Sequence, residues 1–258
     1  MPDDFLVLSV QFQLIRADTY VQGQMAIDVN RLLLETGELV VTGRLVDASN
    51  ATLYAKVTLN AMEKICIYKP IAGERPLWDF PDGTLADREY AAFLVSEFLN
   101  LNVVPLTILR DGPYGQGMVQ EWIDIDESID LANYFSQDIP ELRQMAFFDA
   151  IVNNTDRKIG HLLPTKSGEL FGCDHGVTFH EEDKLRTVLW QWAGDLLTPT
   201  EIAALELLIA SLGNELDLTM HLTVNEIEAI TLRAKHMLNT ATMPLPSPDW
   251  PAIPWPAF

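Results

Sequence analysis

The chain has 258 residues, 48% of them hydrophobic, and a formal net charge of -20. This composition is sufficient for a sizeable buried core, in one domain or in two closely packed lobes. A negative field of this size repels nucleic acid and anionic membrane surfaces, so we expect no nucleic-acid partner.

Membrane and export signals are not apparent in the chain. No apolar run approaches the roughly 20 residues that a membrane span needs, and residues 1–4 are acidic where a signal peptide is basic. Cys66 and Cys173 lie in apolar runs, which favours buried free thiols over a disulfide. We therefore expect a cytoplasmic protein with no stable membrane association.

The first half of the chain is predicted to be mostly strands. One helix is expected over 86–99, after a loop at 70–83, and residues 111–117 are expected to form a turn. Runs of apolar and β-branched residues predict the strands 5–15, 39–45, 52–59, 64–68, 103–109 and 118–123.

The second half is predicted to be mostly helical. A helix is expected over 140–153, with Pro140 in its first turn. Capping boxes that begin at Thr198 and Thr223 open two further helices, which run to about 211 and 239. Before them, short strands are expected at 161–163 and 170–173.

Together these elements predict a bilobal α+β chain, and ligand sites tend to lie between such lobes. The six prolines and two tryptophans of the last 16 residues exclude a helix there and favour docking on the body or on a protein partner. We divide the chain into an N-terminal extension packing on the N-lobe (1–36), an antiparallel-sheet N-lobe (37–122), a mostly helical C-lobe (123–242) and a proline-rich tail (243–258).

Lys69 and Glu89 form the first candidate pair. Lys69 ends an apolar strand, and Glu89 follows 20 residues later, near the start of the next helix. A strand lysine held by a helix glutamate orients an ammonium toward nucleotide phosphates. The alternatives are a strand-end lysine without a function and a solvated first-turn acid, and Glu97 is a rival partner.

A polar segment after the 140–153 helix contains Asp156, Arg157 and Lys158. Phosphoryl transfer needs a carboxylate that orients the acceptor hydroxyl, and cations that offset the phosphate charge. Asp156 supplies the carboxylate, and its two neighbours supply the cations. The alternative interpretation is a surface turn with a local ion pair.

Asp174 ends the second short strand, two residues before Gly176. An aspartate in this position can present its carboxylate to Mg²⁺, which takes one or two carboxylates plus phosphate oxygens. The 18 residues from Asp156 to Asp174 leave room for one β-hairpin, which would return both acids to the same cleft. An Asx turn is the alternative.

Two weaker patterns complete the candidates. Ser49 and Asn50 lie in a loop at 43–52 whose backbone N–H groups could cover phosphates, although an ordinary hairpin turn is the commoner interpretation. A metal-dependent hydrolase is a further possibility, without HExxH or HxH spacing, that would use His161, His175, His180 and Asp174.

Taken in order, these segments resemble the phosphatidylinositol 3-/4-kinase-like superfamily. Residues 156–161 (DRKIGH) look like its catalytic loop D-R-H-x-x-N, and residues 174–176 (DHG) look like its metal motif D-F-G. Residues 68–83 and the LWQWAG run at 189–194 are similar to a compact bacterial branch found in actinobacteria. The resemblance covers roughly residues 37–200.

This resemblance implies a bilobal protein-kinase-like fold and an ATP- and Mg²⁺-dependent phosphotransferase, with Mn²⁺ as a possible substitute. The implied catalytic residues are Asp156 as the base, Lys69 on the phosphates and Glu89 as its partner. The implied metal ligands are Asp174 and His161. The implied nucleotide-binding residues are Ser49, Asn50, Lys69, Gln120, Glu121 and Trp122, the last three in the strand that links the lobes.

His161 departs from the family pattern, which has a metal-binding asparagine at this position. Because Mg²⁺ prefers oxygen ligands, the second metal is expected to be missing, shifted or replaced by a softer ion. The rival hypothesis is a nucleotide-binding pseudokinase whose tail engages a partner. The acceptor stays open among protein, small molecule and lipid, with lipid least favoured by the acidic charge, and AMP transfer is a further alternative.

Overall fold

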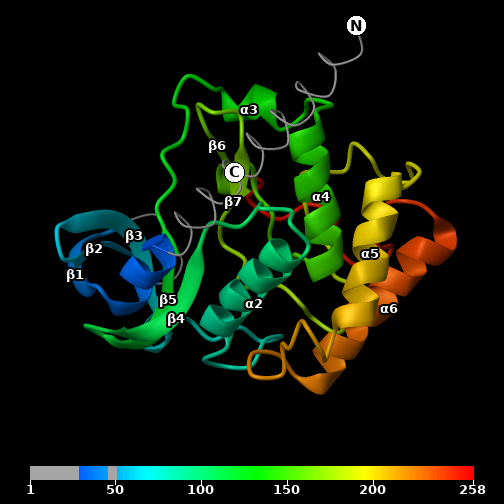
Figure 1. The fold of residues 1–258 in the computed structure, drawn as a ribbon. Coiled ribbons are helices and arrows are strands. Elements are labelled where there is room, and N and C mark those ends of the chain that lie inside the picture. Colours follow the sequence, from blue (N-terminus) through cyan, green and yellow to red (C-terminus); the bar gives the residue numbers. More distant parts are fainter. Residues whose placement is uncertain (1–28, 46–50) are drawn as a thin grey trace, which may run out of the picture.

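The computed structural model describes residues 29–45 and 51–258. An antiparallel sheet lies at one end of the molecule and a group of helices at the other (Figure 1). This is the bilobal α+β arrangement that the sequence predicts. The strand predicted at 5–15, most of the N-terminal extension and residues 46–50 lie outside the described residues.

The sheet has the strand order β1-β2-β3-β5-β4, with all neighbours antiparallel. Side chains alternate between its two faces. In β3, Cys66 and Tyr68 are fully buried in a small core with helical residues 29–36, so Lys69 points to the opposite face. The strands are β1 (Glu38–Arg44), β2 (Leu53–Leu59), β3 (Met62–Pro70), β4 (Thr107–Gly112) and β5 (Gly115–Glu121).

The helical lobe is built around a larger core. Both capping boxes form as predicted, and they open α5 and α6. Among the residues described, no helix is both long and apolar enough to cross a bilayer. The remaining elements are η1 (Ile71–Gly73), α2 (Leu85–Phe98), α3 (Leu131–Tyr134), α4 (Pro140–Val152), η2 (Ile159–His161), β6 (Leu162–Pro164), β7 (Leu170–Gly172), α5 (Pro199–Ser211) and α6 (Val224–Thr240).

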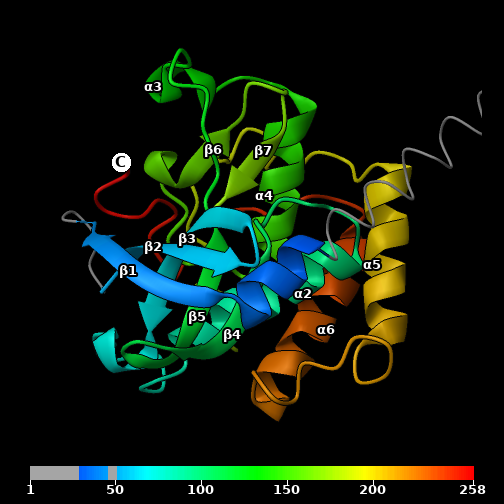
Figure 2. The same cartoon turned by 60° about the vertical axis from the view of Figure 1, so that its left-hand side comes forward.

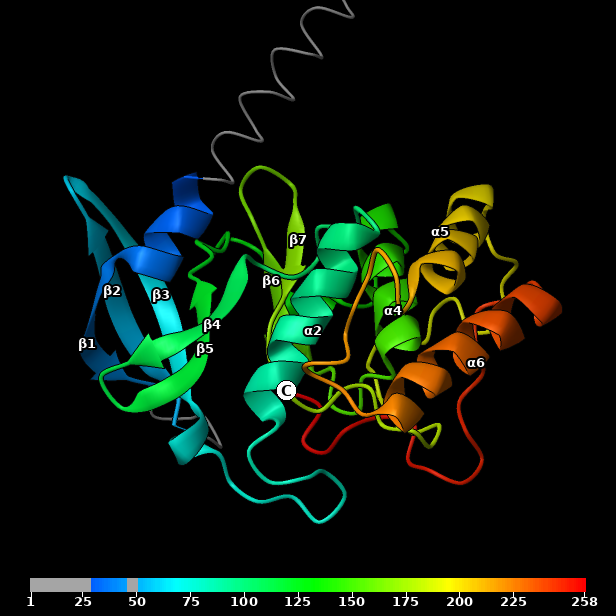
Figure 3. The same ribbon diagram turned by 60° about the horizontal axis from the view of Figure 1, so that its bottom comes forward.

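Helix α2 lies between the sheet and the other helices (Figures 2 and 3). Its apolar side chains, including Ala91 and Val95, belong to the core of the helical lobe. Arg88 is buried, donates to Thr178 O at 2.8 Å and pairs with Glu226 of α6. These contacts fix α2, and with it Glu89, against the helical lobe.

Two predicted boundaries were wrong. The strand predicted over 103–109 begins only at Thr107, because the N–H groups of Val103 and Val104 both donate to Ser96 Oγ. The turn predicted at 111–117 is mostly strand, since β4 and β5 pair as far as their ends. The helical residues 29–36 and the short helix α3 were not predicted.

Candidate active site

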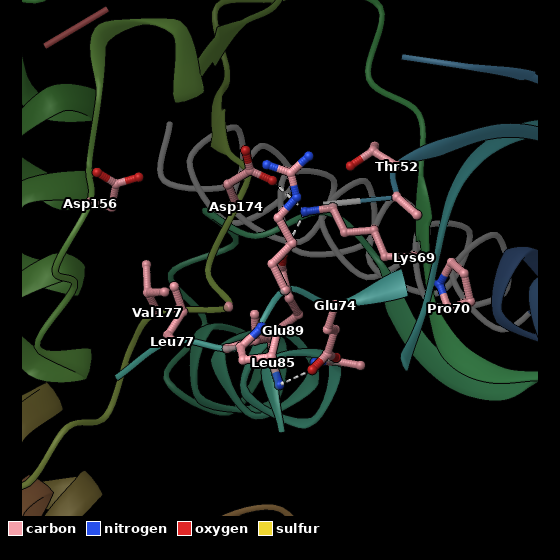
Figure 4. A pocket seen from close by; sticks show the side chains of 15 residues that line it. Thr52, Lys69, Pro70, Glu74, Leu77, Leu85, Glu89, Asp156, Asp174 and Val177 are labelled. Atoms are coloured by element: carbon pink, nitrogen blue, oxygen red, sulfur yellow. Dashed lines mark hydrogen bonds and ion pairs between the residues drawn. The ribbon is translucent and has the colours of Figure 1, made fainter. Parts of the chain in front are cut away.

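A cleft of about 410 Å³ opens between the sheet and the helical lobe (Figure 4). Its walls come from the residues just before β2, the end of β3, the segment before α2, the first turns of α2, and the segments after α4 and β7. The polar and charged lining residues are Thr52, Lys69, Glu74, Arg75, Glu89, Asp156 and Asp174. Four predicted site residues therefore meet in one place, namely Lys69, Glu89, Asp156 and Asp174.

Lys69 connects three elements of this cleft. From the end of β3 its ammonium donates to Glu89 Oε1 of α2 at 2.7 Å. It also bonds Asp174 Oδ1 in the segment after β7. The rival acid Glu97 pairs instead with Arg31 at 2.6 Å, so the partner of the lysine is Glu89.

Mutual attraction keeps Lys69 and Asp174 ionised. Burial alone would lower the pKa of Lys69, but Asp174 and Glu89 together outweigh burial and raise that pKa above its usual range. Lys69 in turn holds the pKa of Asp174 well below its usual range. The Lys69 ammonium is thus held between the side chains of Glu89 and Asp174.

The backbone around Asp174 aims its carboxylate into the cleft. Its φ of 59° lies in the left-handed region, which aspartate tolerates better than most residues. The next residue is fixed because the His175 N–H donates to Glu89 Oε2 at 2.9 Å. The Asp174 side chain stays 49% exposed, so it can accept a further ligand.

Asp156 is placed by the end of helix α4. The helix stops at Asn153, which has a φ of 51° that asparagine also tolerates. Asn154 then donates to Asp149 Oδ1 at 2.9 Å and accepts the Asp156 N–H at 3.0 Å. In Figure 4, Asp156 stands beyond Asp174 as seen from Lys69.

The electrostatic surroundings of Asp156 suit a proton acceptor. Burial raises the pKa of this carboxyl, and the cations Lys158 and Arg186 oppose that effect. Lys158 Nζ lies 3.2 Å from Asp156 Oδ2. A carboxylate whose pKa is raised toward neutrality is a stronger base than one at its usual pKa.

Arg157 does not play the part expected of it. It was predicted to offset phosphate charge, but its side chain is 0% exposed and does not line the cleft. It forms a two-pronged pair with Asp149 of α4, at 2.9 and 2.8 Å. It also donates to Cys173 O at 3.1 Å and contacts His175 Nε2 at 2.7 Å. Its role is to hold the two loops of the site together.

His161 lies beside Asp174, with Nε2 3.4 Å from Oδ2. Its other ring nitrogen, Nδ1, accepts the backbone N–H of Lys158 at 3.4 Å. A neutral imidazole with an accepting Nδ1 carries its proton on Nε2. In this tautomer His161 donates toward Asp174 and offers no lone pair to a metal.

Within the described ranges, no group of three or more His, Cys, Asp or Glu side chains could hold a metal ion. Mg²⁺ does not need such a group, because it binds to one or two carboxylates and to phosphate oxygens. Asp174 fits that requirement. The hydrolase hypothesis loses its other ligands, since His175 contacts Arg157 and His180 Nε2 lies 3.2 Å from Lys184 Nζ.

The predicted nucleotide-binding strand lies outside this cleft. Gln120 is buried and donates to Thr107 Oγ1 at 2.8 Å, and Glu121 pairs with Lys64. Trp122 packs edge-on against Tyr54, with ring centroids 5.2 Å apart. Glu121 and Trp122 line a second cleft of about 970 Å³ beside the β6–β7 hairpin. Ser49 and Asn50 lie outside the described residues.

Glu74 is a lining residue that the sequence did not reveal. Its carboxylate accepts the N–H groups of Leu85 and Ala86, at 3.1 and 2.9 Å. It thus caps α2, whose N-cap residue Thr84 makes no side-chain cap bond. The cap lies ten residues upstream in a loop, so no local sequence pattern announces it.

His161 predicts a pH dependence of stability. Burial lowers its pKa from 6.5 to about 4, more than Asp174 raises it. The unfolded chain therefore binds the proton more readily, and protonation favours unfolding. Without metal and nucleotide, the free energy of unfolding should be highest above pH 6.5 and decrease as the pH falls from 6.5 toward 4. Urea unfolding of wild type and His161→Gln measures this, and an equal loss in both would contradict it.

The fold defined by this structure is that of a kinase. A crystal structure of the Golgi casein kinase with Mn/ADP bound has a TM-score of 0.57 at 14% identity, covering 84% of this chain and 76% of that one. A second structure of the Golgi casein kinase has a TM-score of 0.52 at 14% identity, covering 84% and 74%. The predicted bilobal kinase-like fold is confirmed.

Sequence comparison then identifies the family. No model of a known protein family matches the chain. Protein Rv2133c of Mycobacterium tuberculosis is 42% identical over 268 residues, which cover 90% of this chain and 96% of that protein. The chain belongs to the same family as Protein Rv2133c, which is a bacterial protein.

Proposed function

We propose that the protein is a cytoplasmic, ATP- and divalent-metal-dependent phosphotransferase of the phosphatidylinositol 3-/4-kinase-like type. One observation carries this proposal. Lys69 is bonded to both Glu89 and Asp174 in a cleft that Asp156 also lines. Kinases use a strand lysine, a helix glutamate and two aspartates in these roles. The Golgi casein kinase, which shares the fold, was crystallised with Mn/ADP, and this supports nucleotide and metal binding here.

Each residue has a distinct task in this proposal. Lys69 contacts the phosphates while Glu89 holds its ammonium in place. Asp174 holds Mg²⁺ or Mn²⁺, which when bound offsets the charge of the phosphates. Asp156 accepts the proton of the acceptor hydroxyl. The oxygen of that hydroxyl bonds to the terminal phosphorus of ATP, and the bond from this phosphorus to the ADP oxygen breaks.

A nucleotide-binding regulatory module is the second candidate. It is favoured by His161, whose Nε2 proton faces Asp174 where the family has a metal-binding asparagine. Such a module would bind ATP and release no product. A related arrangement, with the nucleotide inverted in the cleft, would transfer AMP instead of phosphate.

Asp156→Asn is expected to lower ATP turnover about 100-fold, because the asparagine keeps the shape of the side chain but cannot accept a proton. ATP affinity should be nearly unchanged, since Lys69 and Asp174 keep their contacts. Incubation with γ- and α-labelled ATP plus Mg²⁺ or Mn²⁺, followed by mass spectrometry of the products, measures transfer. Ligand-dependent thermal stabilisation measures binding.

The matched control is Asp217→Asn, which makes the same chemical change at an exposed turn. It should leave turnover as in the wild type. Undiminished turnover in Asp156→Asn would remove the assigned base. Label from α-labelled ATP found on the acceptor would indicate AMP transfer. ATP binding with no product under any condition would favour the regulatory module.

A further inference from the structure

The C-terminal tail forms hydrogen bonds with segments of the active site. Ala252 O accepts the backbone N–H of Thr187 at 3.1 Å and the Trp190 Nε1–H at 2.9 Å. Ala257 O accepts the backbone N–H of Ile159 at 2.9 Å. The last of these bonds reaches a residue only three positions beyond Asp156.

The two segments that the tail contacts are themselves paired. Arg157 N–H donates to Arg186 O at 3.1 Å, and Val188 N–H donates to Arg157 O at 3.2 Å. Thr187, which bonds the tail, lies directly between these partners. The tail therefore joins an existing pair of backbone segments, and one of these segments carries Asp156.

A third anchor ties the tail to the wall of the cleft. Trp250 stacks on Trp78, with ring centroids 6.4 Å apart. Lys184 Nζ lies 4.4 Å from the centroid of Trp250 and 4.8 Å from that of Trp78. Trp78 follows Leu77, which lines the cleft. A cation held by two aromatic faces stabilises this junction of three segments.

The composition of the tail suits a rigid strap. Its prolines lack N–H groups and restrict the backbone, so ordering the segment costs less conformational entropy than ordering a flexible one. The bonds described above use tail carbonyl groups as acceptors, as such a segment allows. Figure 2 shows the tail, in red, on the side of the helical lobe that faces the sheet.

We propose that residues 250–258 are a positioning element that holds the Asp156 loop in its productive geometry. This inference rests on the proposed phosphotransferase function. Ile159 is the link, because its N–H is held by Ala257 O while Asn154 holds the other side of Asp156. A displacement of a reacting group by about 1 Å can cost about 100-fold in rate, so the loss of one anchor should be visible in turnover.

The test compares two truncations of the full chain. Removal of Ala257 and Phe258 deletes the Ala257 carbonyl, whereas removal of Phe258 alone turns it into a terminal carboxylate whose oxygen can still accept the Ile159 N–H. The first truncation is expected to lower kcat for ATP turnover about 10-fold with KM for ATP nearly unchanged. The second should retain most of kcat. Trp190→Phe removes the donor to Ala252 without shortening the chain and should lower kcat less.

Hydrogen exchange separates this inference from the proposed function. The Ile159 amide should exchange faster in the chain lacking both residues than in the chain lacking Phe258 alone, whether or not ATP is turned over. Met220→Ala, at a side chain 83% exposed and outside residues 250–258, is the control and should change neither quantity. Equal Ile159 exchange, or equal kcat, in the two truncations would overturn the inference. Absence of turnover in the wild type would instead refute the phosphotransferase.

Discussion

Asp174→Asn is expected to reduce metal-dependent ATP turnover about 1000-fold, the largest loss of any single change in the cleft. Asp174 is the exposed carboxylate beside Lys69, and an amide binds Mg²⁺ far more weakly than a carboxylate. Asparagine tolerates the left-handed backbone that this position requires, with its φ of 59°. The variant should therefore fold, and turnover measured across a titration of Mg²⁺ and of Mn²⁺ isolates the loss of metal binding.

The control for Asp174→Asn is Asp82→Asn, an exposed aspartate outside the cleft lining. It should match the wild type at every metal concentration. The loss in Asp174→Asn should shrink as metal concentration rises if weak metal binding is its cause. Undiminished turnover at low metal concentration would show that the metal is held elsewhere, and the assignment of Asp174 would fail.

The sequence predicted the parts of the site whose placement depends on local structure. Side chains along β3 alternate between the two faces of the sheet. Cys66 and Tyr68 point into the core, so Lys69 points to the opposite face and into the cleft. The hairpin between Asp156 and Asp174 could be predicted from chain length and turn residues. Both features depend on periodicity and short-range turns, which a single sequence displays directly.

Long-range partners were harder to predict. Arg157 was expected in the cleft, yet its charge is used on Asp149, eight residues back in α4. The sequence did contain a sign of the Arg157–Asp149 pair. A single aspartate inside the apolar run FFDAIV requires a buried cation or several hydrogen-bond donors. The proton of His161 was not predictable, since it depends on which backbone N–H meets the ring.

The tail illustrates the same limit. Its proline content correctly excluded a helix, and its tryptophans suggested docking. The groups that bond the tail to the site are the backbone carbonyls of Ala252 and Ala257. Every residue has a backbone carbonyl, so the sequence does not show which carbonyls accept these bonds. Only the fold brings the last residues of the chain to Ile159, because no local pattern encodes a contact across about 100 residues of sequence.

The second large effect is expected on stability. Arg157→Leu should lower the free energy of unfolding by about 3–5 kcal/mol, because it leaves a buried carboxylate without its cation. The side chains of Asp149 and Arg157 are both 0% exposed, so water cannot replace the lost partner. Cys173 O would also lose its donor. Urea unfolding of the two proteins at neutral pH measures the difference.

A double variant separates the stranded charge from the lost packing. Asp149→Asn in the Arg157→Leu background removes the unpaired carboxylate and should recover part of the stability, since a neutral amide costs less to bury than an ion. Arg44→Leu, at an exposed position on β1, should change stability by less than about 0.5 kcal/mol. If Arg157→Leu cost no more than Arg44→Leu, the pair would contribute nothing to folding. The two loops of the site would then have to be held by their other bonds, among them those from the Thr155 N–H and hydroxyl to Val177 O, at 3.1 and 2.8 Å, and from the Cys173 N–H to His161 O, at 3.1 Å.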